Sequence, residues 1–166
     1  MANTEKKASK GKKRSTNLEV RPLEAKDLES VIAIDAAVTG RIRRGFYERR
    51  LTAATKEPKG YIYVGAEEDG QLKGFAMVHV LAGEFGAPGE IAVLDAIGVD
   101  PQAQERGIGR ALMARVDEVT RSKNIHEMHT QADWTELDLL GFLDAAGFEL
   151  APRTVLARNV SGAVGW

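Results

Sequence analysis

The chain has 166 residues, of which 43% are hydrophobic and 28% charged, with a formal net charge of −1. This length suits one domain with a buried core, and no run reaches the ~18–20 apolar residues of a membrane helix. The absence of cysteine excludes disulfides and thiolate catalysis, and the three histidines stand in no usual ligand spacing, so no metal site is predicted. With no apolar export signal at the start, we expect a cytoplasmic protein.

The first 16 residues form a basic tail. They hold six Lys or Arg against one Glu, a net +5, which leaves −6 on residues 17–166. The tail has no aromatic residue for base stacking and no apolar helical period. We therefore predict a disordered leader, with nucleic-acid binding as an alternative.

The predicted elements begin with a short strand that ends near Arg21. Two helical segments follow over residues 24–40 and 41–55, and the second is rich in arginine. Two β-rich runs around Asp69-Gly70 then predict a hairpin with a tight primed turn.

Residues 90–99, EIAVLDAIGV, are almost continuously apolar, which predicts a central strand covered on both faces. After this strand, a helix is predicted over residues 108–123 and a strand over residues 125–133. A second helix is predicted over residues 135–147, and one strand or a broken pair of strands over residues 149–160. This order predicts a mixed α/β sheet with helices on its crossovers.

Two glycines, Gly107 and Gly109, stand where the helix after this central strand begins. Helix N-termini have unpaired N–H groups and a partial positive charge, so a glycine-containing turn there suits a phosphate. The Walker A string G-x-x-x-x-G-K-[ST] does not occur, which excludes that route to nucleotide hydrolysis. A dinucleotide fingerprint fits poorly, because GIGRAL has leucine in the third place and follows a middle strand.

The string QERGIG, residues 104–109, matches the Q/R-x-x-G-x-G/A pattern of the acyl-CoA-binding motif in the GCN5-related N-acetyltransferase (GNAT) superfamily. The chain resembles this superfamily over about residues 17–160, since a strand and a helix ending in the string FLDAAGF also follow in the same order. The resemblance implies an α/β (mixed α+β) GNAT fold in a domain of residues 17–166. Its central twisted mixed sheet would have about seven strands flanked by four helices.

This resemblance implies an acetyl-CoA-dependent N-acetyltransferase that acetylates a primary amine by direct attack with general-base assistance. The acceptor stays open, and a protein or peptide amine is favoured slightly over a small amine. One alternative is a non-catalytic acyl-CoA-binding sensor or interaction module, and another is a nucleic-acid- or ribosome-associated protein that binds through the tail. Dimers are frequent in the family, so a homodimer is one expected assembly.

In the family, motif amides hold the CoA pyrophosphate and the preceding strand pairs with the pantetheine. The residues that match these positions here are Ile97, Val99, Gln104, Glu105, Arg106, Gly107, Ile108, Gly109 and Arg110. Arg106 either adds a charge-assisted contact to phosphate or is a solvated surface residue.

Asp95 lies inside the apolar central strand, where burial penalises a charge, so it is the first candidate to accept the amine proton. The alternative is that Asp95 only bonds backbone groups or pairs with an arginine. Asp133 is the second candidate.

Many family members carry a tyrosine in the last helix that can protonate the departing thiolate. Leu143 occupies that place here. The proton would then come from solvent or from another hydroxyl, such as that of Tyr47, Tyr61 or Tyr63.

The family's acceptor lies against the first two helices, where this chain carries Arg41, Arg43, Arg44, Arg49 and Arg50. These cations favour an acidic acceptor, unless they form a solvated face paired with the acidic body. Arg43, Arg44 and Trp134 are the candidate acceptor-binding residues, although a core position is favoured for Trp134. His79 is interpreted as a core or interface histidine.

Overall fold

The computed structural model describes residues 17–82 and 89–158, so the predicted tail lies outside the described residues. The chain divides into two compact units, Met1–Gln131 and Ala132–Trp166. Among the described helices, none has the length and apolar character needed to cross a membrane.

The described part of the first unit contains β1 (Leu18–Pro22), α1 (Leu28–Thr39), α2 (Arg44–Lys56), β2 (Tyr61–Glu68), β3 (Gln71–Ala82), β4 (Glu90–Val99), α3 (Ile108–Ser122) and β5 (Met128–Thr130). Single 3-10 turns stand at η1 (Ala25–Asp27), η2 (Pro58–Gly60) and η4 (Pro101–Ala103). The second unit contains α4 (Leu137–Ala145).

The sheet is mixed, with the strand order β1-β2-β3-β4-β5. Strands β1 to β4 are antiparallel and β5 runs parallel to β4, as expected from the crossover through α3. The mixed sheet and the four helices are confirmed within the described residues, but the sheet has five strands rather than about seven.

The missing strands were predicted after α4. Residues 149–158 form no strand, and their apolar side chains are exposed; Leu150, Val155 and Leu156 are examples. A strand needs a partner for its backbone groups, and this segment pairs with none in the described chain, while Pro152 also lacks an N–H.

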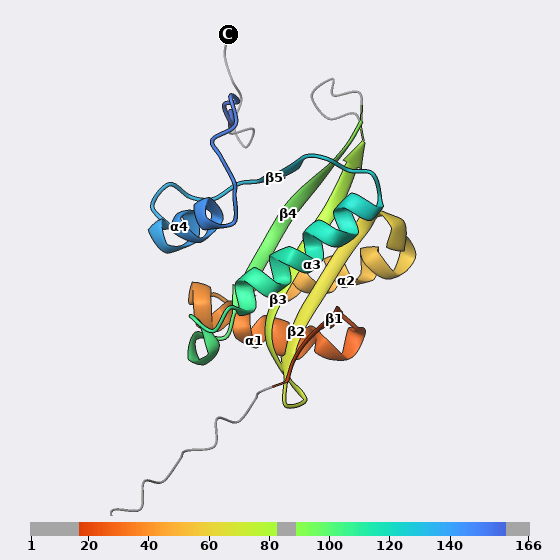
Figure 1. The fold of residues 1–166 in the computed structure, drawn as a ribbon, viewed down its shortest axis with the longest axis vertical. Helices are drawn as coiled ribbons and strands as arrows, with labels where there is room; N and C mark the ends of the chain where they lie inside the picture. The colour runs from red at the N-terminus through yellow and green to blue at the C-terminus, as the bar shows by residue number, and fades with distance from the viewer. Residues whose placement is uncertain (1–16, 83–88, 159–166) are drawn as a thin grey trace, which may run out of the picture. The chain divides into compact units, whose positions relative to one another are not determined.

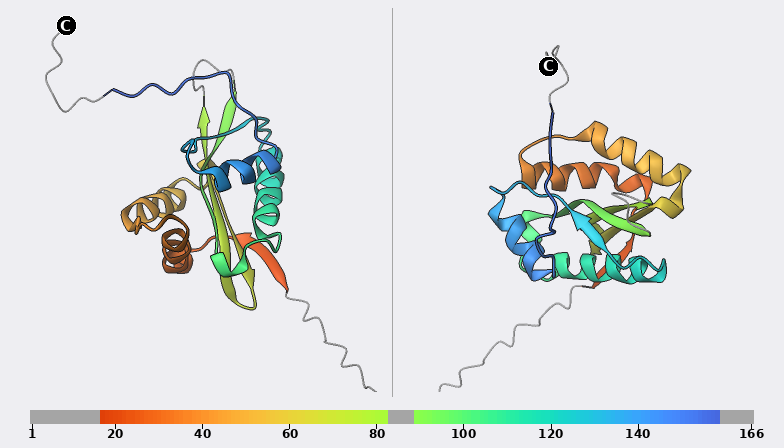
Figure 2. Two further views of the ribbon diagram at one scale, coloured as in Figure 1. Left: turned by 90° about the vertical axis from the view of Figure 1, so that its left-hand side faces the viewer. Right: turned by 90° about the horizontal axis from the view of Figure 1, so that it is seen from above.

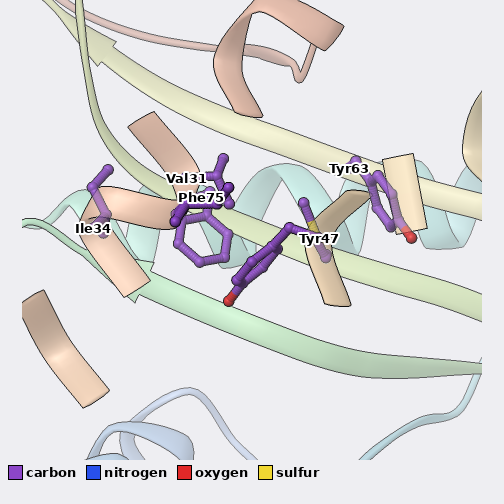
Figure 3. Close-up of a cluster of buried hydrophobic side chains, with 7 residues drawn as sticks. Val31, Ile34, Tyr47, Tyr63 and Phe75 are labelled. Atoms are coloured by element: carbon purple, nitrogen blue, oxygen red, sulfur yellow. The ribbon is translucent and has the colours of Figure 1, made fainter. Parts of the chain in front are cut away.

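Helices cover both faces of the sheet in the first unit: α1 and α2 lie on one face and α3 on the other (Figures 1 and 2). The core under α1 and α2 includes Val31, Ile34, Tyr47, Tyr63 and Phe75 (Figure 3). On the opposite face, α3 buries apolar residues at helical spacing, Ile108, Leu112, Met113 and Val116.

The β2–β3 hairpin turns at the predicted place. Asp69 and Gly70 both have positive φ, 52° and 77°, as a type I′ turn requires. This turn, together with a one-residue register shift between Glu67 and Ala66, places Tyr61 opposite His79 and Tyr63 opposite Met77. The two tyrosines, Met77 and His79 therefore share the face beneath α1 and α2.

A tight contact fixes α3 to the sheet at Gly74. A Cβ placed there would lie 2.9 Å from Cγ2 of Ile108, 3.1 Å from the Gly98 carbonyl oxygen and 3.1 Å from Cδ1 of Leu112. We expect Gly74→Ala to lower the free energy of unfolding by about 1–3 kcal/mol, because neighbouring groups must shift. Urea denaturation measures this. Gly89→Ala is the control, since a Cβ at Gly89 meets no atom within 4 Å, and equal losses for both variants would contradict the argument.

A buried ion-pair network joins β1, η1 and β2. Arg21 donates to Asp27 at 2.7 Å and to Glu67 at 2.7 Å, and the Asp27 side chain is 8% exposed. The hydrogen bond from Arg21 lowers the pKa of Asp27 below its usual 3.8, although burial opposes this. The network therefore stabilises the fold above pH ~3.8, and the contribution is lost as the pH falls through the lowered pKa.

We expect Asp27→Asn to cost about 1–3 kcal/mol at neutral pH, because Arg21 loses a charged partner. The difference from wild type should shrink below pH ~3.8, where the wild-type carboxylate becomes protonated. Urea denaturation at pH 7 and at pH 3 measures it, with the exposed Glu19→Gln in β1 as the control. A loss of stability that does not change with pH would show that the charge of Asp27 is irrelevant.

Candidate active site

Strand β4 carries one extra residue at Asp95. Met77 of β3 pairs with Ala96, while the next residue, Val78, pairs with Leu94, so Asp95 forms a β-bulge. A bulge redirects the side chain of its extra residue. The Asp95 side chain reaches toward α2 and β3 on the face that α1 and α2 cover.

Two cationic or donor groups enclose the Asp95 carboxylate. Its Oδ1 lies 3.1 Å from Nη2 of Arg50 in α2, and its Oδ2 lies 2.8 Å from Nδ1 of His79 in β3. The side chain is 7% exposed. Asp95 therefore pairs with an arginine, as the alternative interpretation expected, and also with a histidine.

Two buried polar atoms beside this group have no hydrogen-bond partner among the described residues. They are Nε of Arg50 and the hydroxyl of Tyr63. The Arg50 guanidinium lies 4.4 Å from the ring centroid of Phe46, a cation–π contact. Burial is the main cause that raises the pKa of Tyr63; the charge of Arg50 lowers this pKa and that of Asp95 raises it by smaller amounts, so the hydroxyl keeps its proton at neutral pH. Such atoms normally bind water or a ligand.

The end of β4 that follows Asp95 is open on one side. Pairing with β5 ends at Leu94 and Thr130, where the Thr130 hydroxyl donates to the Leu94 carbonyl at 2.9 Å. In the described chain, Asp95 stands unpaired at the bulge and residues 96–99 pair only with β3. The backbone groups of the half-buried Ile97 and Val99 lie in this half-paired stretch, where the sequence analysis placed them.

The glycine motif forms the turn into α3. Gly107 is the N-cap residue with φ 82°, no side chain caps the helix, and Glu105 also has positive φ, 61°. The first intrahelical bond is donated by the Ala111 N–H to the Gly107 carbonyl, so the preceding amides have no acceptor inside the helix. A Cβ at Gly107 would meet no protein atom within 4 Å, so the space in front of it is open.

Side chains of the same motif fasten this turn to the sheet. Gln104 donates to the Val99 carbonyl at 3.3 Å, and Arg106 contacts the buried Glu68 at the end of β2 at 2.5 Å. Ile108 is buried against the sheet, whereas Arg110 is exposed. Arg106 is thus an exposed residue whose charge is paired with Glu68.

Tyr47 lies in the core rather than at the opening. It is fully buried, packs edge-on against Phe46 and Phe75, and accepts a hydrogen bond from Arg43 at 3.2 Å. Burial, and then its neighbour Asp35, raise the pKa of Tyr47. The structure therefore gives no support to Tyr47 as a proton donor, because a solvent-borne substrate cannot reach a hydroxyl inside the core.

Both arginines proposed to bind the acceptor are already paired. Arg43 contacts the buried Asp35, and Arg44 donates to both carboxylate oxygens of Glu29 at 2.7 and 2.8 Å. Arg44 also lies 3.6 Å from Glu48. Arginines of this basic segment therefore pair with carboxylates of the same protein, which is the alternative that the sequence left open. The number of arginines overstates the positive charge available to a substrate.

The second unit holds the remaining candidates. Asp133 accepts hydrogen bonds from the Thr135 amide at 3.0 Å and hydroxyl at 2.7 Å, which lower the pKa of Asp133 and make it a weaker base. Trp134 is 83% exposed and is not a core residue. Leu143 is buried and offers no hydroxyl.

His79 and Tyr63 are the polar residues that sequence analysis undervalued. A period-two pattern over β3 places His79 on the same face as Phe75 and Met77, which favours a core residue. The bulge that turns Asp95 onto that face has no sequence signature. The described residues contain no group of three or more His, Asp or Glu side chains able to hold a metal ion.

Comparison with known proteins agrees with this geometry. Residues 26–148 match the model of the acetyltransferase (GNAT) family. The chain is 28% identical to the aminoglycoside N(6')-acetyltransferase type 1 of Stenotrophomonas maltophilia, over 75% of this chain and 86% of that protein. It is 30% identical to a mycothiol acetyltransferase of Kocuria rhizophila over 72% of this chain, but spans only 40% of that longer protein.

Among solved structures, an aminoglycoside N-acetyltransferase in complex with CoA shares the fold, with a TM-score of 0.73 and 19% identity. The match covers 89% of this chain and 98% of that one. The predicted superfamily, the N-acetyltransferase class and the acetyl-CoA cofactor are confirmed at this level. The chain belongs to the acetyltransferase (GNAT) family.

Proposed function

We propose that this chain transfers the acetyl group of acetyl-CoA to a primary amine in the opening along β4. The observation that carries the proposal is the half-paired stretch of β4, residues 95–99, which begins at the enclosed Asp95 and leads through η4 to the glycine turn of α3. The candidate catalytic group at Asp95 and the candidate anion-binding turn before α3 therefore lie at the two ends of one continuous segment, formed by the end of β4 and η4.

The turn from Gln104 to Arg110 would hold the CoA pyrophosphate. Its support is the left-handed Gly107, the amides at the start of α3 that lack intrahelical acceptors, and the open space in front of them. Ile97 and Val99 would hydrogen-bond the pantetheine amides through their backbones, as an added strand does. Acetyl-CoA supplies an activated acyl group, and the chain supplies its position.

The amine must arrive as an ammonium group and lose a proton before it can attack. The Asp95 carboxylate is balanced by Arg50, so what it brings to the opening, together with His79, is a group able to take part in proton transfer. The CoA thiolate is a weak base and a good leaving group, so it can depart without a proton from the protein and be protonated by solvent afterwards, which suits a chain with Leu143 in the last helix.

The pairing of Arg43 and Arg44 removes most of the support for an acidic acceptor. The relatives are named for aminoglycosides and mycothiol, which supports a small amine of the sugar-linked kind. We therefore place a small sugar-linked amine ahead of the peptide amine that the sequence favoured slightly, and both belong in the test.

The first prediction of this proposal is acetyl-CoA-dependent turnover. The purified chain should release CoA when given sisomicin, spermidine or a peptide with a free N-terminus, and the product should gain 42 Da, about the mass of one acetyl group replacing one hydrogen. Thiol release and mass spectrometry measure this. Acetyl-CoA binding without turnover of any amine would instead favour the acyl-CoA-binding sensor.

The second prediction concerns the glycine turn. Gly107→Glu should weaken acetyl-CoA binding at least 100-fold, because the new carboxylate occupies the open space and repels the pyrophosphate. Gly40→Glu is the control: Gly40 has a similar φ, 70°, and open space, but it ends α1 and is not part of the glycine motif that begins α3. Calorimetric titration measures both. Unchanged affinity in a folded Gly107→Glu protein would remove the pyrophosphate assignment.

A further inference from the structure

We propose that Nε2 of His79 is the atom that accepts the proton of the acceptor amine, and that Asp95 and Arg50 are positioning residues for it. This inference deepens the proposed function and rests on it. The observation behind it is that both oxygens of the Asp95 carboxylate are in contact with protein groups: Oδ1 with Arg50 and Oδ2 with His79.

Asp95 is poorly placed to receive a proton itself. Its side chain is 7% exposed, while that of His79 is 21% exposed. A proton on Asp95 would also weaken its contact with Arg50, which carries a permanent positive charge. His79, the more exposed member of the pair, is therefore the better proton acceptor.

The contact between Asp95 and His79 fixes the tautomer of the imidazole. A carboxylate has no hydrogen to donate, so the 2.8 Å contact requires the proton of neutral His79 to be on Nδ1. Nε2 then carries the lone pair. Within the described residues the recorded hydrogen bond of the His79 ring is the one at Nδ1, which leaves the lone pair of Nε2 for a substrate.

The surroundings of His79 suit a group that becomes charged during the reaction. The charged and titratable groups that face it are Asp95 from β4, Arg50 from α2, and Tyr61 and Tyr63 from β2. Lys59, in the turn η2 that packs near β3, is exposed to solvent. Asp95 would stabilise an imidazolium, and Arg50 would hold Asp95 in place. Nε of Arg50 and the hydroxyl of Tyr63 would then be available to hydrogen-bond polar groups of a ligand or water.

The acetyl transfer removes two protons from the acceptor nitrogen. The ammonium group of the acceptor gives one proton to Nε2 of His79, and the freed amine nitrogen bonds to the acetyl carbon as the carbon–sulfur bond breaks. The nitrogen then loses a second proton to solvent, and the departed thiolate takes one proton from solvent to give the thiol. His79 returns its proton to solvent, so the protein is unchanged.

The test uses His79→Asn, because the asparagine amide can still donate to Asp95 while Nε2 is lost. With the best acceptor of the panel, kcat/KM at pH 7 should fall by about 100- to 10,000-fold. The loss should shrink as the pH rises and the amine deprotonates by itself, and the acetyl-CoA affinity should not change. The exposed His126→Asn should behave as wild type.

A second measurement needs no acceptor. Long-range ¹H–¹⁵N correlation spectra of the histidine rings, with His79 assigned by the loss of its signals in His79→Asn, report the tautomer directly. We expect the neutral Nδ1–H form in the wild type. In Asp95→Asn the Nε2–H form should increase, because an amide can also donate to Nδ1.

The outcomes separate the two proposals. If the wild type acetylates no amine, the proposed function fails and the role of His79 fails with it. If the wild type is active but His79→Asn keeps its rate and pH profile, or the wild-type ring is in the Nε2–H form, only this inference is overturned.

Discussion

The site depends on one buried carboxylate at an irregular point of the sheet. Asp95 occupies the bulge of β4 at the position where β4 stops pairing with β5. A buried charge must be paired, and its partners here come from α2 and from β3. The same ion pair therefore holds a helix against the sheet and keeps a titratable histidine beside the opening, so stability and chemistry share one group.

A second constraint links this opening to the helix that would bind phosphate. Gly74 lets Ile108 and Leu112 approach the sheet closely, so the start of α3 has little freedom to move away from the end of β4. Arg106 and Gln104 add polar contacts from the turn to the neighbouring strands. The motif residues thus have two functions, since their backbone faces the open space while their side chains hold the turn in position.

Much of this fold could be predicted from the sequence because its signals are local. The β2–β3 turn follows from an Asp-Gly pair between β-rich runs, and α3 follows from its helical period and its two glycines. The strands expected after α4 show why such reasoning fails elsewhere. Their apolar residues resemble those of a strand, but a strand also needs a partner, and sequence pattern does not reveal whether one is present.

The chemistry of the site was harder to predict, because it rests on long-range pairing. Asp95 was identified as unusual and an arginine partner was one alternative, but a one-residue bulge leaves no pattern, so neither the choice of Arg50 nor the contact with His79 could be foreseen. The arginines show the reverse error. Their number predicted a cationic surface, whereas Arg43 and Arg44 are paired with Asp35 and Glu29.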